Sequence, residues 1–284
     1  MNCLPLSTPN DIGATGQSRF GEKGGAALPA ARARLLSRIR RRFAVLTEDV
    51  RVGPLRLAFT RIEDPNRVLD EVAAEEDRLE KVKGERVAED QLHLPYWAEL
   101  WDSAIGVARH LAEGSGFGVQ GSGKVDSRTS LLNPEPRTLN PLTVLDLGCG
   151  MGLTGTVAAA LGARVTFADL ETPALLFARL NSLQWADRVR TRRLDWRKDR
   201  LGERFDLIVG ADILYERKQW DHLEPFWREH LAPGGMVVLG EPGRRTGELF
   251  IDWIRDRGWR LQQLAEAVET RANPIRLFRL TLPR

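Results

Sequence analysis

Three glycines, Gly148, Gly150 and Gly152, stand at alternate positions between the apolar residues 143–147 and a second apolar stretch. Glycines that follow a buried strand let the backbone turn sharply and approach a ligand with no side chain in between. Together with Gly155, the last two also satisfy the GxGxxG spacing of dinucleotide-binding enzymes. The loop therefore predicts a nucleotide-containing cofactor and leaves open whether that cofactor is a nicotinamide dinucleotide.

Two carboxylates near this loop favour a different cofactor. Asp146 lies two residues before Gly148 and is expected at the rim of the loop, where a carboxylate would repel a pyrophosphate but suits the amino-acid end of a cationic ligand. Asp169 ends the next apolar stretch, where its carboxylate can accept hydrogen bonds from both ribose hydroxyls of either cofactor. The C-terminal region, an expected helix followed by a strand pair, is also more typical of a methyltransferase than of a dehydrogenase. These features predict S-adenosylmethionine as the cofactor.

The sequence after residue 141 predicts the elements that position these groups. Stretches expected as strands alternate with helical patterns, which is typical of a mostly parallel sheet with helices on both faces. The expected strands are residues 143–147, 164–168, 189–194, 205–211, 236–240, 259–264 and 275–282, and the expected helices are 153–161, 173–185, 220–231 and 246–257. The predicted fold class is therefore α/β: a Rossmann-like, doubly wound, mostly parallel seven-stranded sheet with a C-terminal antiparallel strand pair, plus an N-terminal accessory segment.

The chain divides into segments of different character. Residues 1–28, rich in Gly, Ser, Thr and Pro, are expected to be a disordered leader, and residues 29–93 an accessory segment. Residues 94–284 are expected to form the catalytic domain, with a flexible, Gly-, Ser- and Pro-containing insertion at 114–141. The accessory segment is expected to hold a basic helix over residues 30–43, a hairpin over 44–62 and a second helix over 64–83. The basic helix is interpreted as a solvated face, with a docking arm for an acidic partner or an organelle-targeting peptide as alternatives.

Four blocks of sequence carry a resemblance to a known family: residues 97–104, 144–153, 194–196 and 210–215. They read Trp-Ala-Glu-Leu-Trp-Asp-Ser-Ala, Val-Leu-Asp-Leu-Gly-Cys-Gly-Met-Gly-Leu, Leu-Asp-Trp and Gly-Ala-Asp-Ile-Leu-Tyr. From Leu94 onward, leaving out the insertion, the chain resembles the class I, seven-strand S-adenosylmethionine-dependent methyltransferases. The first and last blocks are the most discriminating and resemble the protein-lysine methyltransferase branch. The resemblance therefore implies a protein substrate with a lysine as methyl acceptor.

The resemblance also implies a role for each matching residue. Trp101 would pack against the methionine end of the cofactor, and Asp195 with Trp196 would flank the adenine. Asp212 and Tyr215 would face the methyl-acceptor pocket as the catalytic pair. Packing alone would also explain Trp101 and Tyr215, and a turn cap would explain Asp195. The complete set of expected cofactor-binding residues is Trp101, Asp146, Gly148, Cys149, Gly150, Asp169, Asp195, Trp196 and Ala211.

Composition sets further limits on partners and location. The chain has 42 basic and 39 acidic residues, a formal charge of +3, which gives no reason to expect nucleic acid binding. No apolar stretch approaches the ~20 residues that a membrane span requires. Cys3 and Cys149 are the only cysteines, which fits a reducing compartment, and we expect a cytoplasmic protein. The four histidines lack metal-ligand spacing, so no metal is expected.

Two other functions remain open from the sequence. A small-molecule or nucleic-acid methyltransferase would share the fold, because substrate choice depends on loops and edges. Residues 211–216 lack the Asn-Pro-Pro-Tyr type of motif, which counts against methylation of planar amides or nucleobase amines. A cofactor-binding interaction module without turnover is the other alternative. The presence of Asp146, Asp169 and Asp212 counts against it, because a decayed site is expected to lose at least one of them.

Overall fold

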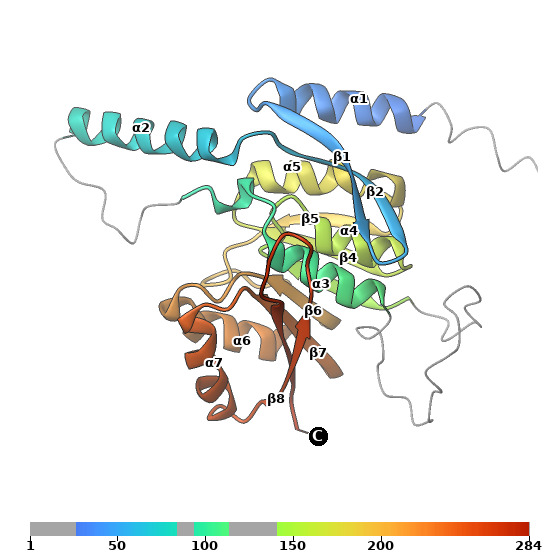
Figure 1. The fold of residues 1–284 in the computed structure, drawn as a ribbon, viewed down its shortest axis with the longest axis vertical. Helices are drawn as coiled ribbons and strands as arrows, with labels where there is room; N and C mark the ends of the chain where they lie inside the picture. The colour runs from blue at the N-terminus through green and yellow to red at the C-terminus, as the bar shows by residue number, and fades with distance from the viewer. Residues whose placement is uncertain (1–26, 84–93, 114–140, 284) are drawn as a thin grey trace, which may run out of the picture.

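The computed structural model describes residues 27–83, 94–113 and 141–283, and Figure 1 shows their arrangement. The expected leader at 1–28 and the expected insertion at 114–141 therefore lie outside the described residues, except for residues 27–28 and 141. Among the helices of the described ranges, none is both long enough and apolar enough to cross a membrane.

A seven-stranded sheet forms the centre of the molecule, in the order β5-β4-β3-β6-β7-β9-β8. The strands are β3 (Thr143–Leu147), β4 (Arg164–Asp169), β5 (Val189–Arg193), β6 (Phe205–Ala211), β7 (Leu231–Glu241), β8 (Arg260–Glu266) and β9 (Ile275–Thr281). Neighbours from β5 to β7 run parallel, and β9 pairs antiparallel with both β7 and β8. The predicted α/β fold class, with its C-terminal antiparallel pair, is confirmed.

The strand order also locates the ligand-binding edge of the sheet. The chain runs outward from β3 through β4 to β5, and then returns to β6 on the other side of β3. This reversal is a topological switch point, and open α/β sheets bind their ligands beyond the carboxyl ends of the strands at such a point. The loops after β3 and β6 are therefore the ones that should carry the functional groups.

Helices cover both faces of the sheet (Figure 1). They are α3 (Asp102–Ala112), α4 (Leu153–Ala160), α5 (Thr172–Asn181), α6 (Trp220–His230) and α7 (Arg245–Arg255), with short 3-10 helices η2 (Tyr96–Ala98), η3 (Leu183–Trp185) and η4 (Arg217–Gln219). Val144 of β3 packs in the core beneath α3, α4 and α5, whereas its neighbour Leu145 packs in a second core beneath α6 and α7. Because both faces of the central strands are buried, their sequence is apolar throughout instead of alternating.

The N-terminal segment packs on the face that carries α5. It consists of α1 (Ala27–Arg40), a hairpin of β1 (Val45–Val52) and β2 (Leu55–Ile62), and α2 (Pro65–Lys83), so the predicted helix–hairpin–helix order is confirmed. Asn181, at the end of α5, accepts a hydrogen bond from the Thr60 amide at 2.8 Å and donates to the carbonyls of Thr60 and Met151, each at 3.0 Å. The hairpin is thus joined, through one buried side chain, to the loop that follows β3.

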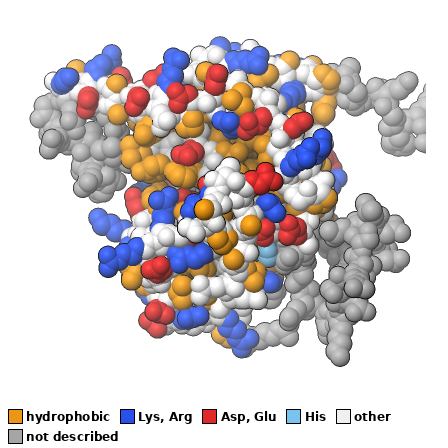
Figure 2. Space-filling view, viewed as in Figure 1, with side chains coloured by type: hydrophobic (Ala, Val, Ile, Leu, Met, Phe, Trp, Pro, Cys, Tyr) orange, Lys and Arg blue, Asp and Glu red, His pale blue; other side chains and the backbone are white. Residues whose placement is uncertain are grey.

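The surface carries charges of both signs. On the face seen in Figure 2, basic and acidic side chains are interspersed, and hydrophobic side chains gather below α2. Many of the basic residues have an acidic neighbour, such as Arg67 with Glu71 at 3.0 Å and Arg200 with Glu229 at 2.7 Å. This mixture agrees with the small formal charge of +3.

Candidate active site

The glycine loop between β3 and α4 has a backbone that requires glycine. Gly148, Gly150 and Gly152 all have positive φ angles, of 65°, 51° and 84°. The amides of Gly148 and Cys149 both donate to the carbonyl of Ala168, at 2.8 and 3.1 Å, which folds the loop over the end of β4. A Cβ atom on Gly148 would lie 2.9 Å from Cγ2 of Ile213, so a side chain there would close the space between the two strand ends. The result is a cradle of exposed backbone at the switch point.

Asp169, the last residue of β4, holds this loop in place. Its Oδ2 accepts the amide of Gly150 and its Oδ1 the amide of Glu171, each at 2.9 Å. A carboxylate offers about four accepting positions, so two stay available for other donors. Burial raises the pKa of Asp169 to about 6, and the two amide hydrogen bonds oppose that rise. Asp169 can therefore fix the loop and still accept a pair of hydroxyl groups, as expected for a ribose.

Asp146 has a different environment from the one that its sequence position suggested. Its Oδ2 accepts the amide of Gly155 in the first turn of α4 at 2.8 Å, and the residue is 2% exposed. Desolvation raises the pKa of Asp146 to about 8. The first amides of a helix have no partner within the helix, so the Asp146 oxygen near the end of β3 supplies an acceptor for one of them. The side chain thus joins β3 to α4 beneath the loop and does not lie at its rim.

Asp195 and Trp196 lie beyond the end of β5, on the other side of the glycine loop. Asp195 accepts two hydrogen bonds from the guanidinium of Arg197, both at 2.8 Å, and this pairing lowers its pKa to about 2. It also accepts the amide of Arg197 at 3.1 Å, as a turn-capping aspartate does. The Trp196 indole donates to Gln219 at 3.0 Å, and its ring lies 3.6 Å from the Cβ position of Gly148. Trp196 is therefore placed to contact anything that lies in the cradle.

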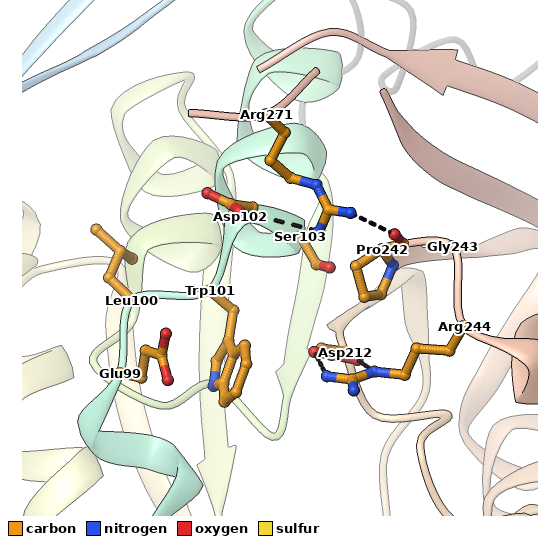
Figure 3. Close-up of a pocket in the computed structure, with 10 residues that line it drawn as sticks. All are labelled: Glu99, Leu100, Trp101, Asp102, Ser103, Asp212, Pro242, Gly243, Arg244 and Arg271. Atoms are coloured by element: carbon orange, nitrogen blue, oxygen red, sulfur yellow. Dashed lines mark hydrogen bonds and ion pairs between the residues drawn. The ribbon is translucent and has the colours of Figure 1, made fainter. Parts of the chain in front are cut away.

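A cavity of about 320 Å³ lies between the start of α3 and the loops that follow β6 and β7, at the same carboxyl edge of the sheet as the cradle (Figure 3). Its lining residues are Glu99, Leu100, Trp101, Asp102, Ser103, Asp212, Pro242, Gly243, Arg244 and Arg271. The Trp101 indole donates to the carbonyl of Tyr96 at 2.9 Å, which fixes the ring plane. Ser103 is 1% exposed, and its hydroxyl has no hydrogen-bond partner within the described part of the chain. A buried polar group of this kind can receive a hydrogen bond from a ligand.

Asp212, expected from the sequence to face the methyl-acceptor pocket, lines this cavity, and it is not a free carboxylate. Arg244 donates to it twice, from Nε to Oδ1 at 3.1 Å and from Nη2 to Oδ2 at 2.7 Å. Asp212 has a φ angle of 53°, which is uncommon for a residue with a side chain. Asp212 directly follows Ala211, the last residue of β6, and this backbone conformation turns the Asp212 side chain toward the cavity. The carboxylate is thus held in an unusual position and is neutralised by an arginine there.

Tyr215 does not line this cavity, but it is the third ring of an aromatic row that begins at Trp101 in the cavity lining. The Tyr215 ring lies edge-on to Tyr96 with centroids 5.5 Å apart, and Tyr96 lies edge-on to Trp101 at 6.3 Å. Burial raises the pKa of Tyr215 to about 12, so its phenol is protonated at neutral pH. Ala211 pairs with Gly240 of β7 beneath this row. Cys149 is half-buried in the loop, and burial raises the pKa of its thiol well above its usual range, which disfavours a nucleophilic thiolate.

The structure brings most of the expected residues to one edge of the sheet. The sequence analysis missed Arg244 and Ser103. For Arg244 a signal was present, because it lies three residues after the end of β7, in a Pro-Gly-Arg turn, and the carboxyl ends of β6 and β7 lie side by side. In the described ranges, the side chains of His, Cys, Asp and Glu form no group of three or more that could hold a metal ion.

Comparisons with known proteins agree with this geometry. A profile of the lysine methyltransferase family matches residues 86–255. The protein N-lysine methyltransferase METTL21A of Danio rerio is 33% identical over 162 residues, which cover 54% of this chain and 64% of that protein. The same enzyme of Xenopus tropicalis is 33% identical over 161 residues, which cover 54% and 63%. The matched region thus spans less than two thirds of the length of these relatives.

Among solved structures, the glycopeptide N-methyltransferase MtfA superimposes with a TM-score of 0.46 and 18% identity, over 50% of this chain and 84% of that one. The family profile is the stronger finding, because it covers more than half of the chain and includes the glycine loop, Asp169 and the Asp212–Tyr215 segment. The chain belongs to the lysine methyltransferase family, a family of S-adenosylmethionine-dependent enzymes.

Proposed function

We propose that this protein transfers the methyl group of S-adenosylmethionine to a lysine side chain of a protein substrate. The observation that carries the proposal is the juxtaposition of two features at the carboxyl edge of the sheet. One is the glycine cradle with Asp169, and the other is the cavity lined by Trp101 and Asp212, with Tyr215 linked to Trp101 through the ring of Tyr96. A cofactor in the cradle and an acceptor in the cavity would be neighbours.

The residues of the cradle fit S-adenosylmethionine. Asp169 has accepting positions for two ribose hydroxyls, and Gly148 and Gly150 have no side chain to fill the space beside the half-buried loop. Trp196 offers a ring for the adenine, and Asp195 would have to share its carboxylate with Arg197 to bind the adenine amino group. When bound, this cofactor supplies a sulfonium methyl group that is itself the electrophile. The protein therefore has no electrophile to activate and acts by orienting the acceptor.

The cavity must supply the acceptor as a neutral amine. Since the reference pKa of lysine is near 10.4, forming the neutral amine at pH 7 costs roughly 4 to 5 kcal/mol. A dry site reduces this cost, because desolvation disfavours the ammonium form. The row of Trp101, Tyr96 and Tyr215, which begins at the cavity lining, would supply apolar surface next to the amine. The oxygens of the Tyr215 phenol and the Ser103 hydroxyl could accept hydrogen bonds from the N–H groups of the amine, which leaves its lone pair free to attack the methyl group.

We also propose a division of the chain into two parts. Residues 94–284 would form the methyltransferase domain and residues 29–93 an accessory segment that supports it. The interspersed surface charges and the formal charge of +3 favour a protein partner over nucleic acid. The two cysteines of the chain favour a reducing compartment, which we infer to be the cytoplasm.

The test is transfer of radiolabelled methyl groups from the cofactor to a cell lysate, followed by acid hydrolysis and amino-acid analysis. We expect label in methylated lysine. The variant to compare with the wild type is Asp212→Asn, which keeps the shape of the side chain and removes its charge. Arg244 is then an unpaired cation that repels lysine in its solution form, the ammonium ion, so KM for the protein substrate should rise and labelling of a dilute lysate should fall, while affinity for S-adenosylhomocysteine stays within about twofold. Label found only in RNA or in small molecules would overturn the lysine acceptor.

A further inference from the structure

Arg244 occupies the place in the cavity that best suits a cation. Its guanidinium forms a two-point pair with Asp212, and its Cζ atom lies 5.8 Å from the ring centroid of Trp101. Figure 3 shows Arg244 and Asp212 turned toward each other, with Trp101 facing them. A carboxylate and an aromatic ring on facing sides are the features that attract an ammonium group. The protein has filled this cation site with its own side chain.

The neighbouring charges are largely neutralised as well. The charged and titratable groups around Arg244 are Tyr96, Glu99, Asp102, Asp212, Glu241, Arg271 and Arg276. Glu241, at the end of β7, pairs with Arg276 at 2.7 Å, and Asp102 lies 3.9 Å from Arg271. Three of the four carboxylates therefore have an arginine partner. The arginine partner of Asp212 is Arg244. The Asp212 side chain is 5% exposed and the Arg244 side chain is 42% exposed.

We propose that Arg244 sets the charge state in which the acceptor amine enters the cavity. By neutralising Asp212, it removes the attraction that would hold a lysine as the ammonium ion, and its own permanent charge disfavours a second cation nearby. The neutral amine, whose lone pair is the nucleophile, is then the form that the site accepts. The proposal rests on the proposed lysine acceptor, and it makes Arg244 a specificity-determining residue.

The consequence is an inverse relation between binding and turnover. Without Arg244, the unpaired Asp212 carboxylate would bind an ammonium more tightly. The same attraction raises the pKa of the bound lysine, so less of it is neutral at pH 7. A variant at this position should therefore bind amines better and methylate them more slowly.

Three variants separate charge from structure. Arg244→Gln removes the charge and keeps a donor to Asp212, and Arg244→Lys keeps the charge and loses the two-point pairing. The third variant, Arg244→Gln with Asp212→Asn, leaves no unpaired carboxylate. A buried carboxylate without its partner destabilises a fold, so this double variant provides the control for a general loss of stability. Thermal melting of all four proteins would accompany each measurement.

The first measurement uses n-butylammonium chloride as a mimic of the lysine side chain, with n-butanol as its neutral counterpart. Binding is followed by the indole resonance of Trp101 in the presence of S-adenosylhomocysteine. In the wild type we expect little preference for the ammonium. Arg244→Gln should bind it at least fivefold more tightly than the wild type does, and the double variant should lose that gain. No gain in Arg244→Gln would overturn the proposal, whatever the natural acceptor is.

The second measurement is the pH dependence of kcat on a synthetic peptide centred on the lysine that takes up label in the lysate. The acidic limb of kcat reports the pKa of the amine in the bound complex. It should move to higher pH by on the order of one unit in Arg244→Gln and stay in place in Arg244→Lys. A parallel loss at every pH would show a structural role and refute the inference. If no lysine takes up label, the proposed function fails, while the butylammonium result still decides the role of Arg244.

Discussion

Replacing Asp169 by asparagine tests the cofactor cradle most directly. The carboxylate accepts the amides of Gly150 and Glu171, and has one free accepting position on each oxygen for the ribose hydroxyls. Asparagine keeps one oxygen but places an amino group where the other was, so one hydroxyl loses its acceptor and the other loses the charge. A hydrogen bond to a charged group contributes about 1.5 to 3 kcal/mol. We therefore expect the substitution to weaken the binding free energy of S-adenosylhomocysteine by roughly 2 to 3 kcal/mol, which corresponds to about a 30- to 150-fold rise in Kd.

The pH dependence of cofactor binding provides a second, independent test of the role of Asp169. The pKa of Asp169 is raised to about 6 in the free protein, and the hydroxyls need the ionised carboxylate as their acceptor. The Kd of the wild type should be constant above pH 6 and should rise up to tenfold per pH unit below it. In Asp169→Asn this slope should be absent.

Calorimetric titration with S-adenosylhomocysteine between pH 5 and 8 measures both effects. Asp187→Asn is the matched control, because its side chain is 72% exposed and its partner is the surface residue Arg188. The control should bind as the wild type does. A Kd for Asp169→Asn within threefold of the wild type at pH 7.5, or a slope that persists in the variant, would remove Asp169 from the cofactor site.

Two further predictions concern stability. Asp146 has its pKa raised from 3.8 to about 8 in the folded protein, so the folded state binds a proton between these values and the free energy of unfolding should fall as pH rises from 4 to 8. In Asp146→Asn, which keeps an acceptor for the Gly155 amide, urea unfolding at pH 5, 6.5 and 8 should show a weaker fall. Asn181→Ala removes three hydrogen bonds and leaves buried backbone groups of Thr60 without a partner, so it should destabilise the protein by about 3 kcal/mol. Substitution of the exposed Gln184 by alanine is its control, and an equal denaturation midpoint for the two variants would contradict the role given to Asn181.

The fold could be predicted because its signals are local. Strand and helix alternation after residue 141 depends on apolar patterns a few residues long, and each expected element is present within a few residues of its predicted bounds. The largest difference is at β7, which begins at Leu231 instead of 236. Leu231 pairs with Phe205 across an irregular register, and no pattern within residues 231–235 indicates that pairing.

The site was predictable only where its chemistry follows directly from a strand end. Gly148 and Asp169 each end or follow a strand, and parallel strands bring such positions together. Arg244 pairs with a residue 32 positions earlier, and Asn181 with one 121 positions earlier. Contacts of this separation depend on the final packing, which a single sequence does not reveal. The same reason explains why Asp146 was expected at the rim, although its acceptor position is taken by an amide of α4.

The accessory segment and the cofactor loop form one continuous packed unit. Phe43, which follows α1, lies edge-on to Trp97 with centroids 5.4 Å apart, and the carbonyl of Trp97 lies 3.5 Å from the Cβ position of Gly150. On the other side, Asn181 links Thr60 of the hairpin to the carbonyl of Met151 in the same loop. A loop with three positive φ angles has few conformational restraints of its own, so contacts from outside must hold it. The N-terminal segment contacts both residues that hold the loop, Trp97 and Asn181, and it packs in the same hydrophobic core, so it can support the loop indirectly.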